Sequence, residues 1–165
     1  MKDAAARYRL RPERPADAAF LLRLYGETRA EEMARTGWPA AACRAFLREQ
    51  RRLQDLHFRR HYPEAHFDIV LIDSRPAGRL YWQEDDQDIH IIDIALLAQH
   101  RNQGLGTALL GDLVAHAAAS GKATRLEVLF GSPAIHLYRR LGFRVTEAGG
   151  GTTHLTMRRP VGPRA

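Results

Sequence analysis

Cysteine is nearly missing from this chain of 165 residues, which has only Cys43. A single thiol cannot build a disulfide framework or a cysteine-based metal site, so we expect no bound metal and a reducing, cytoplasmic setting. Long apolar runs are missing too. No stretch approaches the roughly 18 residues of a membrane helix, and the first ten residues lack the apolar centre of a signal peptide. The sequence therefore predicts neither a membrane protein nor a disulfide-stapled one.

Lysine is also scarce, with two residues against 23 arginines, and yet the formal net charge is +6. Such a charge would suit nucleic acid or another polyanion. The positive residues are spread along the chain, without a long basic block, which favours a small anionic ligand. Nucleic-acid binding through the arginines of residues 44–60 stays open as a weaker alternative.

The hydrophobic pattern predicts one domain, residues 1–165, of the α/β class (α+β, with a mixed sheet). The order is one strand, two helices, three strands, helix, strand, helix and two strands. The last two strands form a hairpin across Gly149–Gly151. We expect helices at about 15–34, 40–60, from the glycine-rich turn to about 120, and from Ser132-Pro133 to Gly142. We expect strands at 7–11, 67–72, 78–82, 89–97, 124–129, 143–146 and 153–157, with a turn at 73–76.

A glycine-rich turn, Arg101–Gly106, lies between a predicted strand and a predicted helix. Two glycines in such a turn let the backbone approach a bulky anion, and the N–H groups at the helix N-terminus can then bind a phosphate or pyrophosphate. The turn is not a P-loop, because Gly106 rather than lysine precedes Thr107. It is not the dinucleotide fingerprint either, because Leu109 stands where a third glycine belongs.

A second motif follows the next predicted strand, at residues 132–143, and ends Leu-Tyr-Arg-Arg-Leu-Gly-Phe. With the pattern Arg101, Gly104, Gly106, this motif makes the chain resemble the GCN5-related N-acetyltransferase (GNAT) superfamily. The motifs cover about 89–143, and the element order matches from 7 to 159. One departure is Gly131, where many members carry asparagine, so that a contact to the cofactor is lost or passes to Ser132.

The resemblance implies an enzyme, an acyltransferase that moves an acetyl group from acetyl-CoA (CoA) to an amine. The turn would hold the pyrophosphate, and the strand end before it would pair with the pantetheine arm. Arg101, Arg139 or Arg140 could meet phosphate charge. The implied cofactor-binding residues are Leu96, Leu97, Ala98, Arg101, Asn102, Gln103, Gly104, Leu105, Gly106, Thr107 and Ser132.

Tyr138 matches the general acid of the family, which would protonate the departing thiolate. The base is open between His90, Asp93 and a water. Strand alternation places His90 and Asp93 on opposite faces, so that only one would face the amine. Asp93 is our first choice, because a carboxylate in an apolar run with no basic residue in its own strand needs a partner, which the amine would supply. Glu127 is expected to face solvent or an arginine.

The acceptor is expected to be a small-molecule or peptide amine, with no membrane partner and with a homodimer possible. The resemblance places the acceptor site at the first two helices and their turn, and carboxylates with aromatic rings there would suit a cation. The candidates are Tyr25, Glu31, Glu32, Trp38, Tyr81 and Trp82. A catalytically silent domain that binds or senses acyl-CoA is the main alternative from another class.

Overall fold

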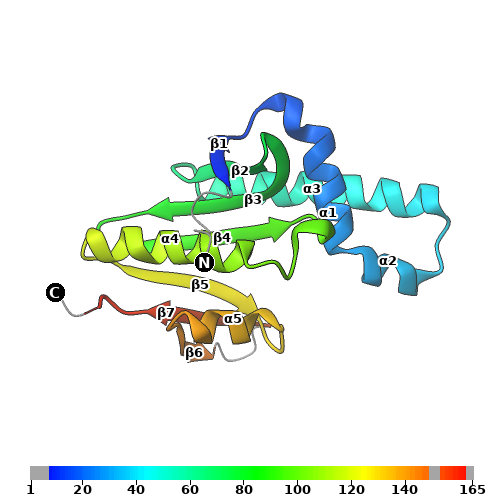
Figure 1. Cartoon of the computed structure of the whole chain (residues 1–165). Helices are drawn as coiled ribbons and strands as arrows, with labels where there is room; N and C mark the ends of the chain where they lie inside the picture. The colour runs from blue at the N-terminus through cyan, green and yellow to red at the C-terminus, as the bar shows by residue number, and fades with distance from the viewer. Residues whose placement is uncertain (1–7, 149–152, 163–165) are drawn as a thin grey trace.

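A seven-stranded mixed sheet runs through the structure, which is a computed structural model describing residues 8–148 and 153–162 (Figure 1). The strand order is β1-β2-β3-β4-β5-β7-β6, and every neighbouring pair is antiparallel except β4 and β5. This confirms the predicted α/β class with a mixed sheet. The strands are β1 (Arg9–Pro12), β2 (His66–Ile72), β3 (Arg75–Glu84), β4 (Asp88–Leu96), β5 (Ala123–Leu129), β6 (Arg144–Ala148) and β7 (His154–Arg159).

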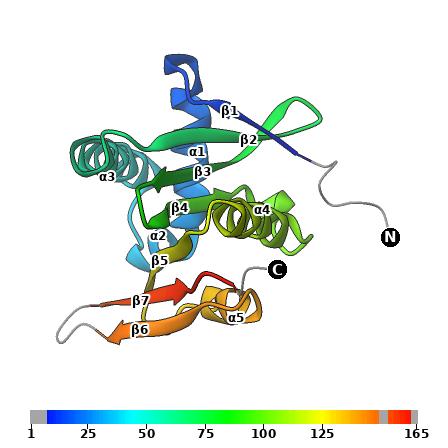
Figure 2. The same cartoon turned by 90° about the vertical axis from the view of Figure 1, so that its left-hand side faces the viewer.

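Helices cover both faces of the sheet, with α3 on one side and α4 on the other (Figure 2). The main core forms where α4 and α5 pack on the sheet, and a smaller one joins α1 to Ile69 and Leu97. The helices are α1 (Ala18–Thr28), α2 (Ala30–Thr36), α3 (Ala40–His61), α4 (Leu105–Ala119) and α5 (Ala134–Arg140), with short 3-10 turns at Pro15–Asp17 and Ala98–His100.

The first predicted helix, 15–34, is wrong as one element, because α1 ends at Thr28 and α2 begins at Ala30. The Thr28 hydroxyl donates a hydrogen bond to the Tyr25 carbonyl at 2.7 Å, and the Arg29 N–H donates to the Gly26 carbonyl. These local bonds compete with the next helical turn. The break turns the chain between the two helices.

The predicted turn at 73–76 is also too long. Asp73 and Ser74 have positive φ angles of 48° and 64° and form a tight two-residue hairpin turn. Arg75 and Pro76 therefore belong to β3, where a register shift accommodates the proline. The predicted glycine turn at 149–151 lies outside the described residues.

A β-bulge interrupts β4 in its middle. Tyr81 of β3 lies opposite Asp93, but the next residue, Trp82, lies opposite Ile91. Ile92 is thus an extra residue with no partner of its own in β3. Such an insertion shifts the alternation of side chains by one position. The residues after the bulge therefore lie on the opposite face from the one that a regular continuation of the strand would give them.

The two parallel strands β4 and β5 separate at this bulge. Their pairing covers only Asp88–Ile91 with Ala123–Leu126. Farther along, β5 continues beside β7, whereas residues 93–96 of β4 pair with β3 alone. Figure 1 shows β5 curving away from β4. One backbone edge of β4 is left facing an opening in the sheet.

Candidate active site

The turn between β4 and α4 lies at one end of this opening. Gly104 has a φ of +81°, in the left-handed region that favours glycine, and a Cβ built there would meet no atom within 4 Å. Because α4 begins at Leu105, its first N–H groups have no carbonyl partner within the helix. Open space and unpaired donors together make a site for an anion.

Two adjoining pockets, of about 580 and 650 Å³, extend from this turn along the free edge of β4. They share six lining residues, Leu96, Arg101, Gly106, Pro133, Ala134 and Leu137. We call the two pockets together the groove. Of the predicted cofactor residues, it is lined by Leu96, Arg101, Asn102, Gly104, Gly106, Thr107 and Ser132.

The other predicted cofactor residues are not among those lining the groove. The Leu97 side chain is 2% exposed and packs against α1, and its N–H donates to Ala77. The Ala98 N–H donates to Glu27, and Leu105 is buried in the core. Gln103 bonds the Gln99 carbonyl. Any role of these four in cofactor binding stays a prediction.

Two of the three arginines named for phosphate binding line the groove. Arg101 does so while its Nε donates to the Leu96 carbonyl at 2.9 Å, a bond that ties the turn to the end of β4. Arg140 lines the pocket at the glycine turn, whereas Arg139 lines a separate pocket beside Phe143. The positive charge available to an anion in the groove comes from Arg101 and Arg140.

Tyr138 lies on α5 at the opposite end of the groove from the glycine turn, and it is 9% exposed. Its ring packs edge-on against Phe143, with the centroids 6.0 Å apart. Burial raises the pKa of the Tyr138 phenol, and the negative charge of Asp93 raises it further. The phenol therefore keeps its proton at neutral pH and can donate it.

His90 and Asp93 lie on the same face of the sheet, so the expectation of opposite faces is wrong. His90 packs edge-on against Tyr62 at the end of α3, at 5.4 Å between centroids. Asp93 binds Arg79, which itself bonds Gln54 of α3. The bulge at Ile92 is the physical reason, because one extra residue reverses the alternation.

Asp93 also has a cationic partner in the protein. Arg79, from the neighbouring strand β3, donates from Nε to Asp93 Oδ2 at 2.7 Å. The argument that only a substrate amine could balance this carboxylate is therefore wrong. The sequence could not reveal the pair, because it depends on the register between β3 and β4. The one available signal was Arg79 itself, a charged residue inside an apolar strand.

His90 is 5% exposed, and its pKa falls to about 4, mainly through burial and also through the positive charge of Arg125. The imidazole ring is thus neutral at neutral pH and has a nitrogen lone pair that can accept a proton. Tyr62, which the sequence did not single out, packs against His90; burial raises the pKa of its phenol, the charge of Glu127 raises it further and that of Arg125 opposes the rise. The exposed Glu127 thus lies near charged neighbours on this side of the sheet.

The six acceptor candidates do not form one site, although three of them gather around Arg29, which contacts Tyr25, Glu32 and the Phe46 ring; that ring packs edge-on against Trp38. Tyr25 is 7% exposed and bonded to Arg29, which also pairs with Glu32. Tyr81 is fully buried against α3. Trp82 lies on the other face, stacked on His66 and bonded to Asp68. Trp38 is 48% exposed, and Glu31 is exposed on α2. Thr28, at the break between α1 and α2, lines the groove instead.

The basic side of α3 is partly neutralised by its own carboxylates. Arg51 and Arg59 pair with Asp55, and Arg52 pairs with Glu49. Among residues 8–148 and 153–162, no cluster of three or more His, Cys, Asp or Glu could hold a metal ion. No helix of this part of the chain is long and apolar enough to cross a membrane.

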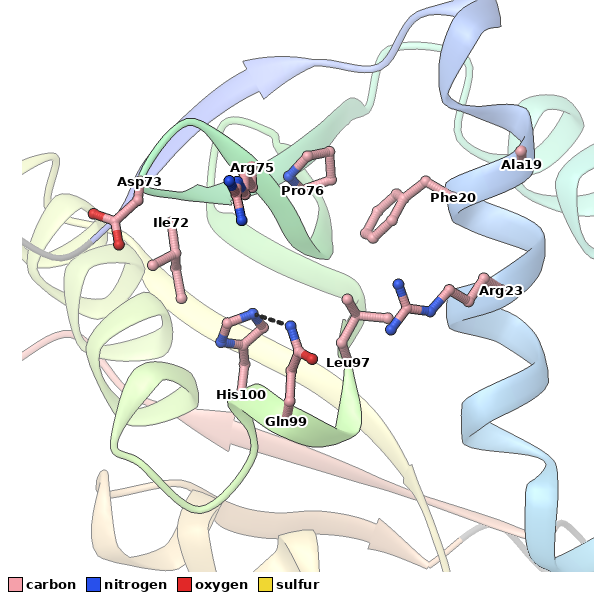
Figure 3. Close-up of a pocket in the computed structure, with 10 residues that line it drawn as sticks. All are labelled: Ala19, Phe20, Arg23, Ile72, Asp73, Arg75, Pro76, Leu97, Gln99 and His100. Atoms are coloured by element: carbon pink, nitrogen blue, oxygen red, sulfur yellow. Dashed lines mark hydrogen bonds between the residues drawn. The ribbon is translucent and has the colours of Figure 1, made fainter.

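A larger pocket, of about 990 Å³, lies apart from the groove, between α1, the β2–β3 turn and the end of β4 (Figure 3). Its lining includes Phe20, Arg23, Arg75 and Pro76, with His100 bonded to Gln99 at one side. Neither the two glycines of the turn nor Tyr138 or Asp93 lines it. Size alone therefore does not identify the active site.

Residues 28–143 match the sequence model of the acetyltransferase (GNAT) family. An acetyltransferase from Thermus thermophilus is 22% identical, with a TM-score of 0.66 over 93% of this chain and 97% of that one. The PaiA N-acetyltransferase from Thermoplasma acidophilum, solved in complex with coenzyme A, is 17% identical, with a TM-score of 0.65 over 93% and 98%. Ard1 from Thermoplasma volcanium is 20% identical, with a TM-score of 0.61 over 94% and 99%. No curated protein sequence matches the chain.

Proposed function

Because the chain belongs to the GNAT family of acetyltransferases, we propose that it transfers the acetyl group directly from acetyl-CoA to a primary amine of a small molecule or a peptide. The chain is an acyltransferase, and acetyl-CoA is its cofactor. The single cysteine of the chain fits a cytoplasmic setting, which is part of the proposal.

The groove fits this cofactor in chemistry. The unpaired N–H groups at the start of α4 and the open space at Gly104 would hold the pyrophosphate, with Arg101 and Arg140 beside them. The edge of β4 at Ile94–Leu96, which has no partner in β5, would pair with the amide groups of the pantetheine arm. Ser132 lines the same part of the groove and can donate a hydrogen bond.

Tyr138 is proposed as the general acid. When bound, acetyl-CoA supplies an acetyl thioester, whose sulfur needs a proton as the acetyl group leaves. Tyr138 holds a proton on its Oη at the end of the groove, where burial and the nearby Asp93 charge keep the pKa of the phenol raised. A neighbouring phenol can donate that proton or a hydrogen bond.

Asp93 is proposed, ahead of His90, to orient or deprotonate the amine. Its Oδ1 accepts no hydrogen bond within the described part of the chain, and its side chain is 25% exposed. His90 lies deeper, where β4 is still paired on both sides, and is covered by Tyr62. The charge of Asp93 also raises the pKa of Tyr138, although Asp93 itself lines neither pocket of the groove.

The observation that carries the proposal is the arrangement of the groove, with the glycine turn at one end and Tyr138 at the other. The test begins with thermal unfolding at saturating acetyl-CoA, which should raise Tm because the cofactor binds the folded state. Gly104→Glu should abolish that rise, because a carboxylate would occupy the anion site. Gly37→Glu is the matched control, since Gly37 also has a positive φ, of 68°, in open space.

Acetyl transfer to a panel of amines is measured beside binding. Free thiol released in the presence of an amine, above the hydrolysis rate, supports the transferase. Binding of acetyl-CoA with no transfer to any small amine or peptide would instead identify a silent acyl-CoA-binding domain.

A further inference from the structure

Arg79 occupies an unusual position for a charged side chain. It lies on β3 between the sheet and α3, and it is 3% exposed. Its Nε donates to Asp93, its Nη2 donates to Gln54 at 2.9 Å, and its guanidinium lies 4.8 Å from the centroid of the Tyr81 ring. Its Nη1 is buried and donates to no acceptor within the described part of the chain.

Such a pair is a poor device for stability. Removing two charges from water costs about as much as their attraction returns, and apolar residues of similar volume often serve as well or better. The unpartnered Nη1 adds a further cost. The pair lies at the bulge, where Asp93 is two residues beyond Ile91, the last β4 residue that pairs with β5. The position of the pair at the bulge and its cost in folding free energy both indicate a role in the reaction.

The contact with Arg79 occupies only one of the two carboxylate oxygens of Asp93. Arg79 binds Oδ2, while Oδ1 accepts no bond from the described residues, and a quarter of the side chain is exposed. The charge of Asp93 also raises the pKa of Tyr138, which lines the groove. The carboxylate is thus held at one oxygen and available at the other.

We propose that Arg79 is a positioning residue for acetyl transfer, which fixes the Asp93 carboxylate at the opening between β4 and β5 with one oxygen free for the acceptor amine. This inference rests on the proposed function. Arg79 itself touches neither the cofactor groove nor the acceptor; it acts through Asp93. Gln54 and the Tyr81 ring fix the guanidinium in turn, so α3 is coupled to the reacting centre.

Other charged groups on this face are already committed to partners of their own. Glu13 accepts from Tyr81 at 2.5 Å and pairs with Arg59, while Asp55 pairs with Arg51 and Arg59. His90 is neutral at neutral pH. No other cation within the described residues pairs with Asp93, so removal of Arg79 leaves the carboxylate without a replacement.

The test is a double-mutant cycle of Arg79→Met and Asp93→Asn, read for both stability and activity. Each single variant leaves one charge unpaired and should lower Tm, and the double variant should recover most of that loss. Arg79→Met should lower kcat/KM for the amine on the order of 10-fold, with the acetyl-CoA shift in Tm unchanged. In the Asp93→Asn background, the same change should cost less than about 2-fold.

Arg79→Lys retains the charge without the two directed bonds and should fall between wild type and Arg79→Met. Arg52→Met removes an arginine from an exposed pair with Glu49 and serves as the control, with no effect on kcat/KM expected. The inference is overturned if Arg79→Met keeps full kcat/KM, or if the double variant regains activity together with Tm. The stability half of the cycle needs no acceptor, so it distinguishes a failed inference from a failed acetyltransferase assignment.

Discussion

The two halves of β4 differ in one respect, the number of their partners. Residues 89–91 pair with β3 on one side and with β5 on the other, whereas residues 93–96 pair with β3 alone. Ile89 and Ile91 in the first half are buried in the main core. Asp93 and Leu96 in the second half lie by the opening, and Leu96 lines the groove.

This difference shows how one strand can serve two purposes. A strand with partners on both sides has no free backbone groups, so its contribution is to packing. A strand that loses one partner exposes donors and acceptors at regular spacing, which a ligand rich in amides can use. Substitutions in the first half should therefore affect stability, and substitutions near the second half should affect the reaction.

The largest expected effect lies in the doubly paired half. Ile89 is fully buried, so Ile89→Ala should lower the free energy of unfolding by about 2–5 kcal/mol through lost burial and a cavity. Denaturant unfolding measures this loss. The acetyl-CoA shift in Tm and kcat/KM should stay within about 2-fold of wild type at a temperature where the variant is folded. A loss of transfer activity in folded protein would contradict the assignment of the doubly paired half of β4 to stability alone.

Tyr138→Phe should give the largest kinetic effect, because it removes the proton donor and keeps the ring. We expect kcat to fall on the order of 100-fold, with acetyl-CoA binding little changed. Tyr8→Phe is the control, since Tyr8 bonds Asp112 of α4 and lines neither pocket of the groove. Full kcat in Tyr138→Phe would reduce this tyrosine to a packing residue.

Asp93→Asn should have a smaller effect, because shape and hydrogen bonding are retained while the charge is lost. We expect kcat/KM for the amine to fall on the order of 10-fold and the affinity for acetyl-CoA to stay the same. Steady-state kinetics with each substrate varied in turn separates the two. A change that falls on acetyl-CoA alone would move Asp93 from the acceptor side to the cofactor side.

His90→Gln should have the smallest effect on activity at neutral pH, since His90 lies in the doubly paired half. Its pKa of about 4 is below the ordinary 6.5, so the unfolded state takes up a proton first as the pH falls. Stability should therefore fall between about pH 6.5 and 4, and His90→Gln should flatten that fall. Unfolding at pH 7 and pH 4.5 measures the difference. Loss of acetyl transfer in His90→Gln, with Asp93→Asn losing only stability, would reverse the two roles.

Periodicity and turn residues were sufficient to predict the mixed sheet and the order of the elements, except that the first predicted helix is two helices. The break at Thr28 was not predictable in this way, because it depends on a hydroxyl that bonds the Tyr25 carbonyl. The glycine turn and Tyr138 were found because each belongs to a local motif. The Arg79–Asp93 pair joins residues 14 positions apart, and only the register of two strands brings them together.

The prediction that His90 and Asp93 lie on opposite faces was wrong for a related reason. Alternation is a property of a regular strand, and nothing in the run Ile91-Ile92-Asp93-Ile94 marks one isoleucine as extra. The bulge arises from pairing with β3, where Tyr81 and Trp82 lie opposite Asp93 and Ile91. The residue pattern of one strand does not specify its register with the neighbouring strand.

The extra residue in β4 makes the acceptor chemistry depend on how β4 pairs with β3 as well as on its side chains. If the bulge were lost while Ile92 was retained, a regular strand would turn Asp93 toward α4, away from Arg79, although no functional residue had been substituted. Deletion of Ile92 itself would remove the bulge and leave Asp93 on the face of Arg79, because Ile91 and Asp93 would then be adjacent residues of a regular strand. Grafting the site onto another sheet would therefore require a strand pairing that places Asp93 opposite Tyr81, in addition to the side chains themselves.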